Sequence, residues 1–295
     1  AAAHTIAAAL QSLQAQSFGD WEAICINDRT PDGADAIVAE FARQDPRIRL
    51  VNSPEAGPSA ARNYGAEIAQ GALLAFCDAD DLWTSEKLEE MHRAFGVQGV
   101  SGLYGRIGFF TETPADSRTQ STVPGGALTI PQLLAENPVC TMSNLVLRRD
   151  AFLAVGGLDR DAVHNEDLEL LIRLVGLGHS IEGIDQLHVW YRTAPTGLSA
   201  DLGAMQRGRQ RALLTAERFG AQPTSRGEAV YLRYLARRAL RVDADPKEAL
   251  GYTLAGIKQN PGAFLFPIRR GGATALASVV AFLLPARQRH ALFSR

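Results

Sequence analysis

An apolar run that ends in clustered carboxylates constrains the fold of this chain more than any other feature. Residues Leu73 to Cys77 are all apolar, and Asp78, Asp80 and Asp81 follow within four positions. The run predicts a buried strand, and ligands of open α/β sheets bind at the carboxyl ends of strands. Carboxylates this close repel each other unless a cation or hydrogen bonds compensate. The segment therefore predicts a divalent cation that carries phosphate oxygens, and the alternative is an Asp-capped helix turn after a strand.

Helical and strand patterns alternate around this segment, which predicts an α/β fold with a mostly parallel sheet flanked by helices. Helical periodicity begins almost at residue 1, whereas an α/β chain usually opens with a strand, so we expect a first strand to be missing. The expected helices are 3–16, one capped by Asp32, 59–70, 85–95 and one opening at Asn165, and the expected strands are 21–26, 47–51, 73–77, 100–111, 143–147 and 181–191. Residues 112–126 are rich in Thr, Ser, Pro and Gly and predict a mobile loop.

The charge of the chain is distributed unevenly. Residues 201–295 hold 16 Lys and Arg against 6 Asp and Glu, a balance of +10, and residues 1–200 hold 14 against 26, a balance of −12. Only helical patterns occur after about residue 200. We therefore expect an α/β domain over 1–200 and a basic helical C-terminal region over 201–295.

One stretch of the C-terminal region predicts a membrane contact. Residues 271–286 carry no charge and lie between Arg269-Arg270 and Arg287. As a helix these 16 residues would reach about 24 Å, which is short of the ~30 Å hydrocarbon core of a bilayer. A basic amphipathic helix in the membrane interface is the physically better interpretation, and the alternative is an ordinary helix packed on the first domain.

The composition excludes several other classes. Hydrophobic residues make up 46% of the chain and charged residues 21%, which is typical of a globular protein. The spacing of Cys25, Cys77 and Cys140 fits no metal or redox pattern, and the six histidines contain no His-x-x-x-His pair, so no structural zinc is expected. We expect all three cysteines to be reduced core residues of a cytoplasmic protein.

Six weak motifs occur in one order along residues 4–200. They are Ser12 to Ser17, Trp21 to Asp28, Asn52 to Gly57 with Ala61 to Gly65, Asp78 to Trp83, Gly156 to Asp159 with Glu166 to Leu170, and Tyr191-Arg192. In this order the chain resembles glycosyltransferase family 2, whose members have the GT-A fold. The acidic cluster resembles the DxD motif of that family, and Gly156 to Leu170 resembles its acceptor-side motif.

The resemblance implies roles for the donor side. Asn27 and Asp28 would border the nucleotide base, although the family often has two acids there; a turn after a strand is the alternative. Arg62 would point toward the nucleotide or its diphosphate, or would be a solvated helix arginine. Asp78 would lie near the ribose or the metal, and Asp80 would bind the metal, which we expect to be Mn²⁺ or Mg²⁺. Asp81 is expected to cap the next turn.

The resemblance also implies roles for the acceptor side. Asp167 would be the general base, and Glu166 would raise the pKa of Asp167 or orient the acceptor. The alternative is that both residues only favour a helix N-terminus electrostatically. Asn63 and Gly65 are expected to be close-packing positions. His188 is expected to be a packed or solvated histidine, and the alternative is a site residue near Tyr191-Arg192.

These expectations combine into an inverting glycosyltransferase that moves a sugar from a nucleotide-diphosphate donor, a UDP-sugar, to a hydroxyl of a glycan or lipid-linked glycan. The resemblance implies surface glycans of the cell envelope as products. We expect a cytoplasmic protein without a nucleic acid partner, and the basic C-terminal region predicts a peripheral contact with the inner face of the cytoplasmic membrane. Two alternatives stay open: a non-catalytic nucleotide-sugar binder, and a sugar-phosphate nucleotidyltransferase. The second class typically has a glycine-rich phosphate loop near its start, and no such loop is visible in the sequence.

Overall fold

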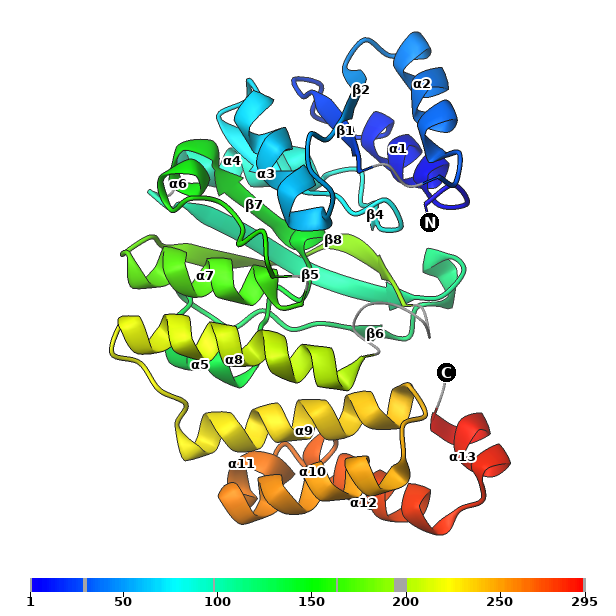
Figure 1. Cartoon of the computed structure of the whole chain (residues 1–295), viewed down its shortest axis with the longest axis vertical. Helices are drawn as coiled ribbons and strands as arrows, with labels where there is room; N and C mark the ends of the chain where they lie inside the picture. Colours follow the sequence, from blue (N-terminus) through cyan, green and yellow to red (C-terminus); the bar gives the residue numbers. More distant parts are fainter. Residues whose placement is uncertain (1, 29–30, 98, 163, 194–200, 294–295) are drawn as a thin grey trace. The chain divides into compact units, whose positions relative to one another are not determined.

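The computed structural model describes residues 2–28, 31–97, 99–162, 164–193 and 201–293 (Figure 1). The chain forms two compact units, the first made of Ala1–Leu128 and Pro138–Thr193 and the second of Thr129–Asn137 and Ala194–Arg295. Residues 129–137, which we expected in the first domain, are therefore grouped with the C-terminal helices. The expected boundary near residue 200 adjoins residues outside the described part, so that boundary stays a prediction.

The strands of the first unit form two sheets. The strands are β1 (Ala23–Asn27), β2 (Ile48–Asn52), β3 (Leu73–Ala75), β4 (Leu82–Trp83), β5 (Gly102–Phe110), β6 (Thr119–Gln120), β7 (Leu145–Arg148) and β8 (Ile181–Arg192). β1 and β2 pair in parallel, with Ala23 opposite Ile48 and Asn27 opposite Asn52. The other six strands form one sheet in the order β3-β7-β5-β8-β4, with β6 paired to β5.

The six-stranded sheet is mixed, and the expectation of a mostly parallel sheet is wrong in this detail. Only the pair β5–β8 is parallel in it, and the pairs β3–β7, β5–β7, β4–β8 and β5–β6 are antiparallel. Apolar periodicity reports which face of a strand is buried, and it carries no information on the direction of the neighbouring strand. The sequence pattern therefore located the strands and could not orient them.

Helices flank these strands in the first unit (Figure 1). They are α1 (Ile6–Gln14), α2 (Ala34–Gln44), α3 (Pro58–Ile68), α4 (Lys87–Val97), α6 (Arg149–Ala154) and α7 (Glu166–Gly176), with the 3₁₀ turns η1 (Pro114–Asp116) and η2 (Met142–Asn144). The sequence did not predict α6 or β4, and the expected loop 112–126 contains η1 and β6. β3 is shorter than expected because the chain leaves the sheet at Phe76, two residues before the first carboxylate.

Apolar faces of helices and strands hold the first unit together. Met91 and Phe95 on α4 pack with Leu103 on β5 and Val146 on β7. A second cluster joins Trp83, Ile107 and Val189 from the adjacent strands β4, β5 and β8. Each large apolar side chain that is fully buried contributes about 1.5–3 kcal/mol to stability. These clusters fix the strand ends from which the polar residues of the site project.

The second unit is helical in its described part. Its helices are α5 (Ile130–Ala135), α8 (Leu202–Arg218), α9 (Ser225–Arg241), α10 (Pro246–Gln259), α11 (Pro261–Leu265), α12 (Gly271–Leu283) and α13 (Ala286–Phe293). Side chains of Asp201, Thr224, Asp245 and Asn260 accept backbone N–H bonds at the first turns of α8, α9, α10 and α11 and so define where these helices begin. Among the described residues no helix combines the length and the apolar character that a membrane span requires.

The cysteines are free thiols, and one of them lies where the sequence did not predict. Cys25 and Cys77 are partly buried, and burial raises the pKa of the Cys25 thiol to about 11. Cys140 is exposed, which corrects the expectation that it is a core residue. Its backbone is left-handed, with a φ of 67°, in an irregular segment just before η2.

Candidate active site

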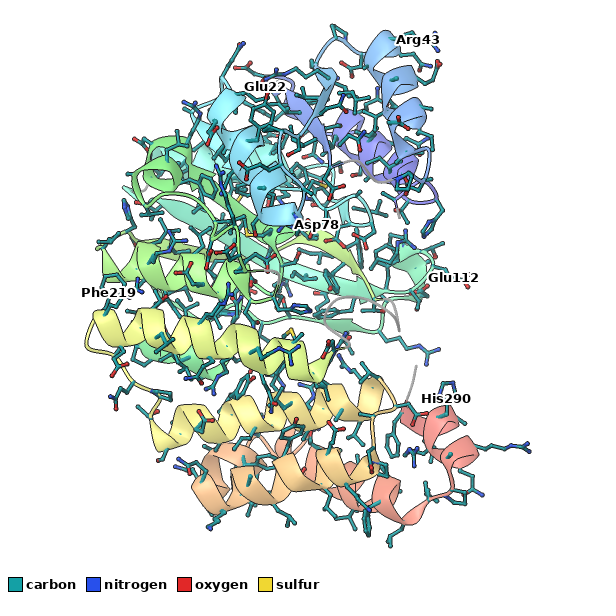
Figure 2. The ribbon with its side chains drawn as sticks, in the orientation of Figure 1. Glu22, Arg43, Asp78, Glu112, Phe219 and His290 are labelled. Atoms are coloured by element: carbon teal, nitrogen blue, oxygen red, sulfur yellow. The ribbon has the colours of Figure 1, made fainter. Side chains whose placement is uncertain are left out.

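Asp78 is held by three residues from two other segments, two of them through its carboxylate and one through its backbone. Arg62 Nη2 donates to Asp78 Oδ1 at 2.5 Å, and Thr141 Oγ1 donates to Asp78 Oδ2 at 3.2 Å. The backbone N–H of Asp78 donates to Ser143 Oγ at 2.9 Å. Burial alone would raise the pKa of Asp78, but the charge and hydrogen bonds of Arg62 lower it below its ordinary value. Asp78, labelled in Figure 2, is therefore a fixed and ionised carboxylate.

Asp80 and Asp81 have opposite environments. The side chain of Asp80 is exposed, whereas Asp81 is only 1% exposed. Asp81 Oδ1 accepts the backbone N–H of Arg192 at 3.0 Å. The expectation that Asp81 caps the next turn is therefore wrong. The turn lies between two strands, and the carboxylate of Asp81 binds the backbone of β8 instead. Burial and then the charge of Asp78 raise the pKa of Asp81 well above its ordinary value.

Arg192 at the end of β8 supports the acidic loop from the other side. Its Nε donates to the carbonyl oxygen of Asp80 at 3.1 Å, and its Nη1 donates to the carbonyl oxygens of Thr111 and Glu112. The guanidinium also lies 4.5 Å from the ring centroid of Phe110. Arg192 thus connects the ends of β5 and β8 to the backbone that carries Asp80.

A buried lysine lies beneath the same loop. Lys87 has no exposed surface, and its Nζ donates to the carbonyl oxygen of Ser143 at 2.5 Å and lies 3.9 Å from the ring centroid of Trp83. Trp83 Nε1 donates to the same carbonyl oxygen at 3.1 Å. Burial lowers the pKa of Lys87 to about 7. Lys87 and Trp83 together fix the segment whose Ser143 hydroxyl holds Asp78.

Arg62 connects the segment of Asp78, expected on the donor side, to the segment of Glu166, expected on the acceptor side. It lies on α3, which begins with Pro58 after Gly57. Its Nη1 donates to Glu166 Oε1 at 2.9 Å, and its Nη2 donates to Asp78 Oδ1. Burial alone would lower the pKa of Arg62, but the negative charges of Asp78 and Glu166 raise it above its ordinary value. The two motifs lie 88 residues apart in the sequence, from Asp78 to Glu166, and one guanidinium links their carboxylates.

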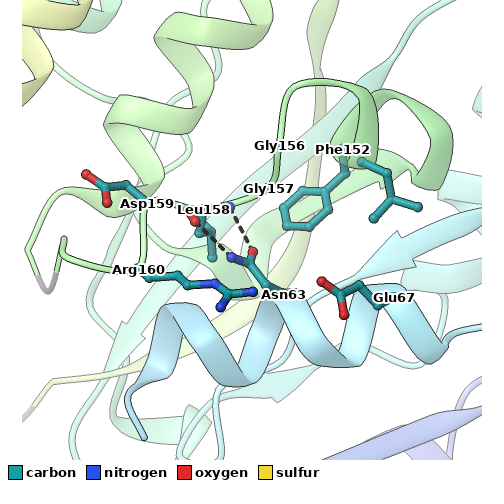
Figure 3. A pocket seen from close by; sticks show the side chains of 9 residues that line it. Asn63, Glu67, Phe152, Gly156, Gly157, Leu158, Asp159 and Arg160 are labelled. Carbon is teal, nitrogen blue, oxygen red and sulfur yellow. Dashed lines mark hydrogen bonds between the residues drawn. The ribbon is translucent and has the colours of Figure 1, made fainter. Parts of the chain in front are cut away.

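Asn63, the next residue on α3, anchors the glycine pair of the acceptor-side motif (Figure 3). Its Nδ2 donates to the carbonyl oxygen of Leu158 at 2.8 Å, and its Oδ1 accepts the N–H of Leu158 at 2.8 Å. Gly157 has a φ of +68°, and a Cβ there would lie 2.5 Å from Asn63 Oδ1, so only glycine fits. The expectation that Asn63 is a packing position agrees with this geometry. The hollow in Figure 3 has a volume of ≈ 440 Å³ and contains none of the expected donor residues.

Glu166 and Asp167 form the first turn of α7, after Asn165 with a φ of 58°. Glu166 is paired with Arg62, so its charge is partly balanced. Asp167 Oδ1 accepts the backbone N–H of Leu168 at 2.8 Å. This bond fits the helix N-terminus alternative, and the base role of Asp167 stays a prediction.

A large cavity brings the expected donor residues together. Its volume is ≈ 1100 Å³, and its lining includes Asn27, Asp28, Arg62 and Asp78 along with apolar side chains of β1, β3, α1 and α4. Asn27 Nδ2 also donates to Asn52 Oδ1 at 3.2 Å across the β1–β2 pair. Asp80, Glu166 and Asp167 do not line this cavity, so the structure connects the two sides of the site through Arg62.

Four residues that contribute to this arrangement were not predicted from the sequence as site residues. They are Lys87, Thr141, Ser143 and Arg192. Thr141 and Ser143 lie in a polar run before β7, but no spacing in the sequence relates that run to Asp78. Arg192 was noted only because Tyr191-Arg192 resembles a family motif, and the sequence around Lys87 indicates an ordinary residue in the first turn of a helix.

His188 is a packed histidine, one of the environments expected from the sequence. It has no exposed surface, and its Nε2 lies 2.6 Å from Glu90 Oε2. Burial is the largest effect on the pKa of His188 and lowers it. The charge of Lys87 lowers this pKa further, and the hydrogen bond to Glu90 compensates only in part.

The lowered pKa of His188 makes stability depend on pH. His188 takes up a proton near pH 6.5 in the unfolded chain and at a lower pH in the folded chain. The contribution of neutral His188 to the free energy of unfolding is therefore present above about pH 6.5 and is lost as the pH falls. We expect His188→Gln, which keeps an amide for Glu90, to flatten the loss of unfolding free energy between pH 7.5 and 5.5 in urea titrations. The exposed His92→Gln serves as control, and equal slopes in both variants would contradict the assignment.

The carboxylates fit a divalent cation only in part. Among the described residues no group of three or more His, Cys, Asp or Glu side chains is arranged to hold a metal ion. Asp80, however, presents an exposed carboxylate whose pKa is raised by desolvation and by the charge of Asp78. A cation would relieve that repulsion, and hard cations accept phosphate and water oxygens as their remaining ligands. The residues therefore fit a cation that arrives with a diphosphate.

A protein-family comparison matches most of the first unit. The family model described as Glycosyl transferase family 2 matches residues 2–156, which is more than half of the chain. A curated relative, the UDP-Glc:alpha-D-GlcNAc-diphosphoundecaprenol beta-1,3-glucosyltransferase WfgD of Escherichia coli, is 35% identical over 105 residues, covering 35% of this chain and 41% of WfgD. The matches span less than half the length of the curated relatives.

Solved structures show the same fold at low sequence identity. TarS of S. aureus in complex with UDP-GlcNAc matches with a TM-score of 0.59 and 15% identity, covering 97% of this chain and 88% of the TarS chain. The mannosyltransferase PcManGT of Pyrobaculum calidifontis, in complex with GDP-Man and Mn²⁺, matches with a TM-score of 0.58 and 16% identity, covering 95% and 84%. The expected GT-A fold with C-terminal helices is confirmed.

Proposed function

We propose that this chain, which belongs to glycosyl transferase family 2, transfers a sugar with inversion from a nucleotide-diphosphate donor to an acceptor hydroxyl. One observation carries the proposal: Arg62 binds Asp78 and Glu166 at once. Asp78 belongs to the DxD-like segment and Glu166 to the segment that resembles the acceptor-side motif, so this contact supports a single transfer site built from both. Neither a strand turn nor a helix N-terminus by itself requires such a link.

Each group then has a definite task. Asn27 and Asp28, in the cavity that Arg62 and Asp78 also line, would hold the base of the nucleotide. Asp167 would accept the proton of the acceptor hydroxyl as its oxygen bonds to the anomeric carbon. The bond from that carbon to the diphosphate oxygen breaks, and the nucleoside diphosphate leaves with the electron pair. Arg62 already forms ion pairs with two carboxylates and acts as a positioning residue. Its contact with the diphosphate stays a prediction.

A divalent cation, Mn²⁺ or Mg²⁺, belongs to this proposal. Asp80 would hold it, with Asp78 close by, and the cation would neutralise charge that builds on the leaving diphosphate. Asp80 is suited to this task because its carboxylate is exposed and its backbone is fixed by Arg192. Asp78 is committed to Arg62 and Thr141 and would contribute mainly charge.

The names of relatives support a particular donor and acceptor class. The name of WfgD gives UDP-Glc as donor and a diphosphoundecaprenol-linked GlcNAc as acceptor, and TarS was solved with UDP-GlcNAc. We propose a UDP-sugar as donor and a glycan or lipid-linked glycan of the cell envelope as acceptor. A lipid-linked acceptor would bring the enzyme to the inner face of the cytoplasmic membrane, and the +10 balance of residues 201–295 supports a peripheral contact there.

The metal assignment is tested by removing the exposed carboxylate. We expect Asp80→Ala to abolish the Mn²⁺-dependent part of UDP affinity, because this residue presents the free carboxylate for the cation. Isothermal titration of UDP with Mn²⁺ and with EDTA measures it. Asp185→Ala removes a carboxylate that is 79% exposed on β8 and should change nothing. Unchanged Mn²⁺-dependent affinity in Asp80→Ala would sink the assignment.

A further inference from the structure

Helix α12 buries small and polar side chains and exposes large apolar ones, the reverse of a surface helix in a water-soluble protein. The side chains it buries are small or polar: Gly271, Thr274, Ser278 and Ala281. The side chains it exposes are large and apolar: Leu276 (65% exposed), Val279, Phe282 and Leu283 (73% exposed). A surface helix normally buries its apolar stripe and exposes charged residues. Helix α12 contains no charged residue at all.

The buried face of α12 is bound inside the second unit by polar contacts. Thr253 Oγ1 on α10 donates to Ser278 Oγ at 2.8 Å, and Ser278 Oγ donates to the carbonyl oxygen of Thr274 at 2.9 Å. A Cβ at Gly271 would lie 2.0 Å from the carbonyl oxygen of Phe264, so the chain packs closely there. These contacts fix the orientation of α12, because turning its leucines inward would leave the buried hydroxyl of Thr253 without its partner Ser278.

The exposed apolar surface continues on both sides of α12 and is bordered by arginines. Phe266 (65% exposed) and Ile268 (60% exposed) precede the helix, and Leu292 on α13 follows it. Arg269 and Arg270 come directly before α12, where Arg270 is paired with Glu136, and Arg287 comes four residues after the end of the helix. Isolated exposed leucines are ordinary, but contiguous apolar patches of this kind mark an interaction surface.

We infer that the surface formed by Phe266, Ile268, Leu276, Val279, Phe282 and Leu283 inserts into the headgroup and upper acyl region of an anionic bilayer. The occupant is lipid because the surface is apolar along one face of α12 and in the segment just before it, and has Arg269 and Arg287 at its two ends, the arrangement that anionic leaflets bind. No described helix can span a bilayer, so α12 lies along the interface. The inference deepens the proposed membrane contact and rests on the proposed function only for which membrane is bound.

Vesicle flotation of the full chain tests the surface. The vesicles are phosphatidylcholine alone and phosphatidylcholine with phosphatidylglycerol, each at low and high salt. We expect the wild-type chain to float with the anionic vesicles and to be released by salt. Leu276→Ser with Leu283→Ser should lower the bound fraction about tenfold or more, because two large apolar side chains no longer leave water. Leu214→Ser, on α8 and 54% exposed, is the matched control and should float like the wild type.

Three further measurements make the outcome unambiguous. Circular dichroism and light scattering of the double variant should match the wild type, and UDP affinity with Mn²⁺ should be unchanged. The inference is overturned if the wild-type chain binds neither vesicle, if the double variant floats as well as Leu214→Ser, or if the double variant converts a wild-type dimer to a monomer without any vesicle binding. Failure of UDP binding in the wild type would instead count against the proposed function and leave the surface intact.

Discussion

Asp167→Asn is expected to lower the rate of sugar transfer by about 10²–10⁴-fold while UDP affinity stays near that of the wild type, because the amide cannot accept the acceptor proton. The variant keeps a side-chain oxygen that can accept the Leu168 N–H bond, so α7 should begin as before. Transfer is measured as UDP release with saturating donor and acceptor, and affinity by calorimetry. The expected outcome is a loss in kcat with little change in KM for the donor.

The control for this variant is Asp161→Asn, which removes an exposed carboxylate from the loop before α7 and should leave both quantities unchanged. If Asp167→Asn turned over at nearly the wild-type rate with acceptor bound, Asp167 would be a helix-terminus residue only. A shift of stability alone, without a loss in kcat, would lead to the same conclusion.

Arg62→Met is expected to destabilise the fold by about 3 kcal/mol and to weaken UDP binding. Removing the guanidinium leaves the carboxylates of Asp78 and Glu166 partly buried and without their cation, and an unpaired buried charge costs far more than a lost surface pair. Urea unfolding gives the free energy, and calorimetry gives the affinity. Arg62→Lys should fall in between because it restores the charge but not the two-pronged geometry.

A matched surface pair separates this effect from the loss of a positive charge. Arg160→Met breaks the pair with Glu55, whose side chains are 53% and 54% exposed, and should cost less than about 1 kcal/mol. Adding Glu166→Gln to Arg62→Met should recover part of the loss, because one of the two stranded charges is then removed. If Arg62→Met were as stable as Arg160→Met, the guanidinium would not hold the two motifs together.

Local patterns were sufficient to find most elements of the first unit. The alternating segment around Arg49 and the apolar run at Leu73 each became a strand, and the periodic segments became α1 to α4 and α7. What the patterns could not supply was information between distant segments: the strand directions, the two-residue strand β4, and the grouping of 129–137 with the C-terminal helices. Short elements of this kind are fixed by tertiary contacts and have no periodicity of their own.

The site shows the same division between residue identity and residue environment. The types and order of Asp78, Asp80, Arg62 and Glu166 indicated their chemistry, but only the folded structure shows that Arg62 is occupied by two carboxylates. It likewise shows that Asp81 serves the β8 backbone. These outcomes depend on which partners lie within 3 Å of a polar atom, and no spacing in the sequence encodes such distances between α3, η2 and α7.

Of the alternatives to transfer, membership in glycosyl transferase family 2 leaves the non-catalytic binder as the relevant one. A binder and an enzyme would share the proposed donor residues Asn27, Asp28, Arg62 and Asp78, since all four line the cavity of ≈ 1100 Å³. They differ in what happens to the bound donor. Only an enzyme breaks the bond between the sugar and the diphosphate, so donor affinity by itself does not decide between them.

Metal-dependent release of UDP from a panel of UDP-sugars, followed in the full chain with Mn²⁺ and with EDTA, decides whether this chain is a transferase. We expect at least one donor to release UDP with Mn²⁺, EDTA to stop the release, and Asp167→Asn and Asp80→Ala each to suppress it. Tight, Mn²⁺-dependent binding of UDP-sugars with no release from any donor, even when lipid-linked and soluble glycan acceptors are supplied, would contradict the claim and establish a nucleotide-sugar binder.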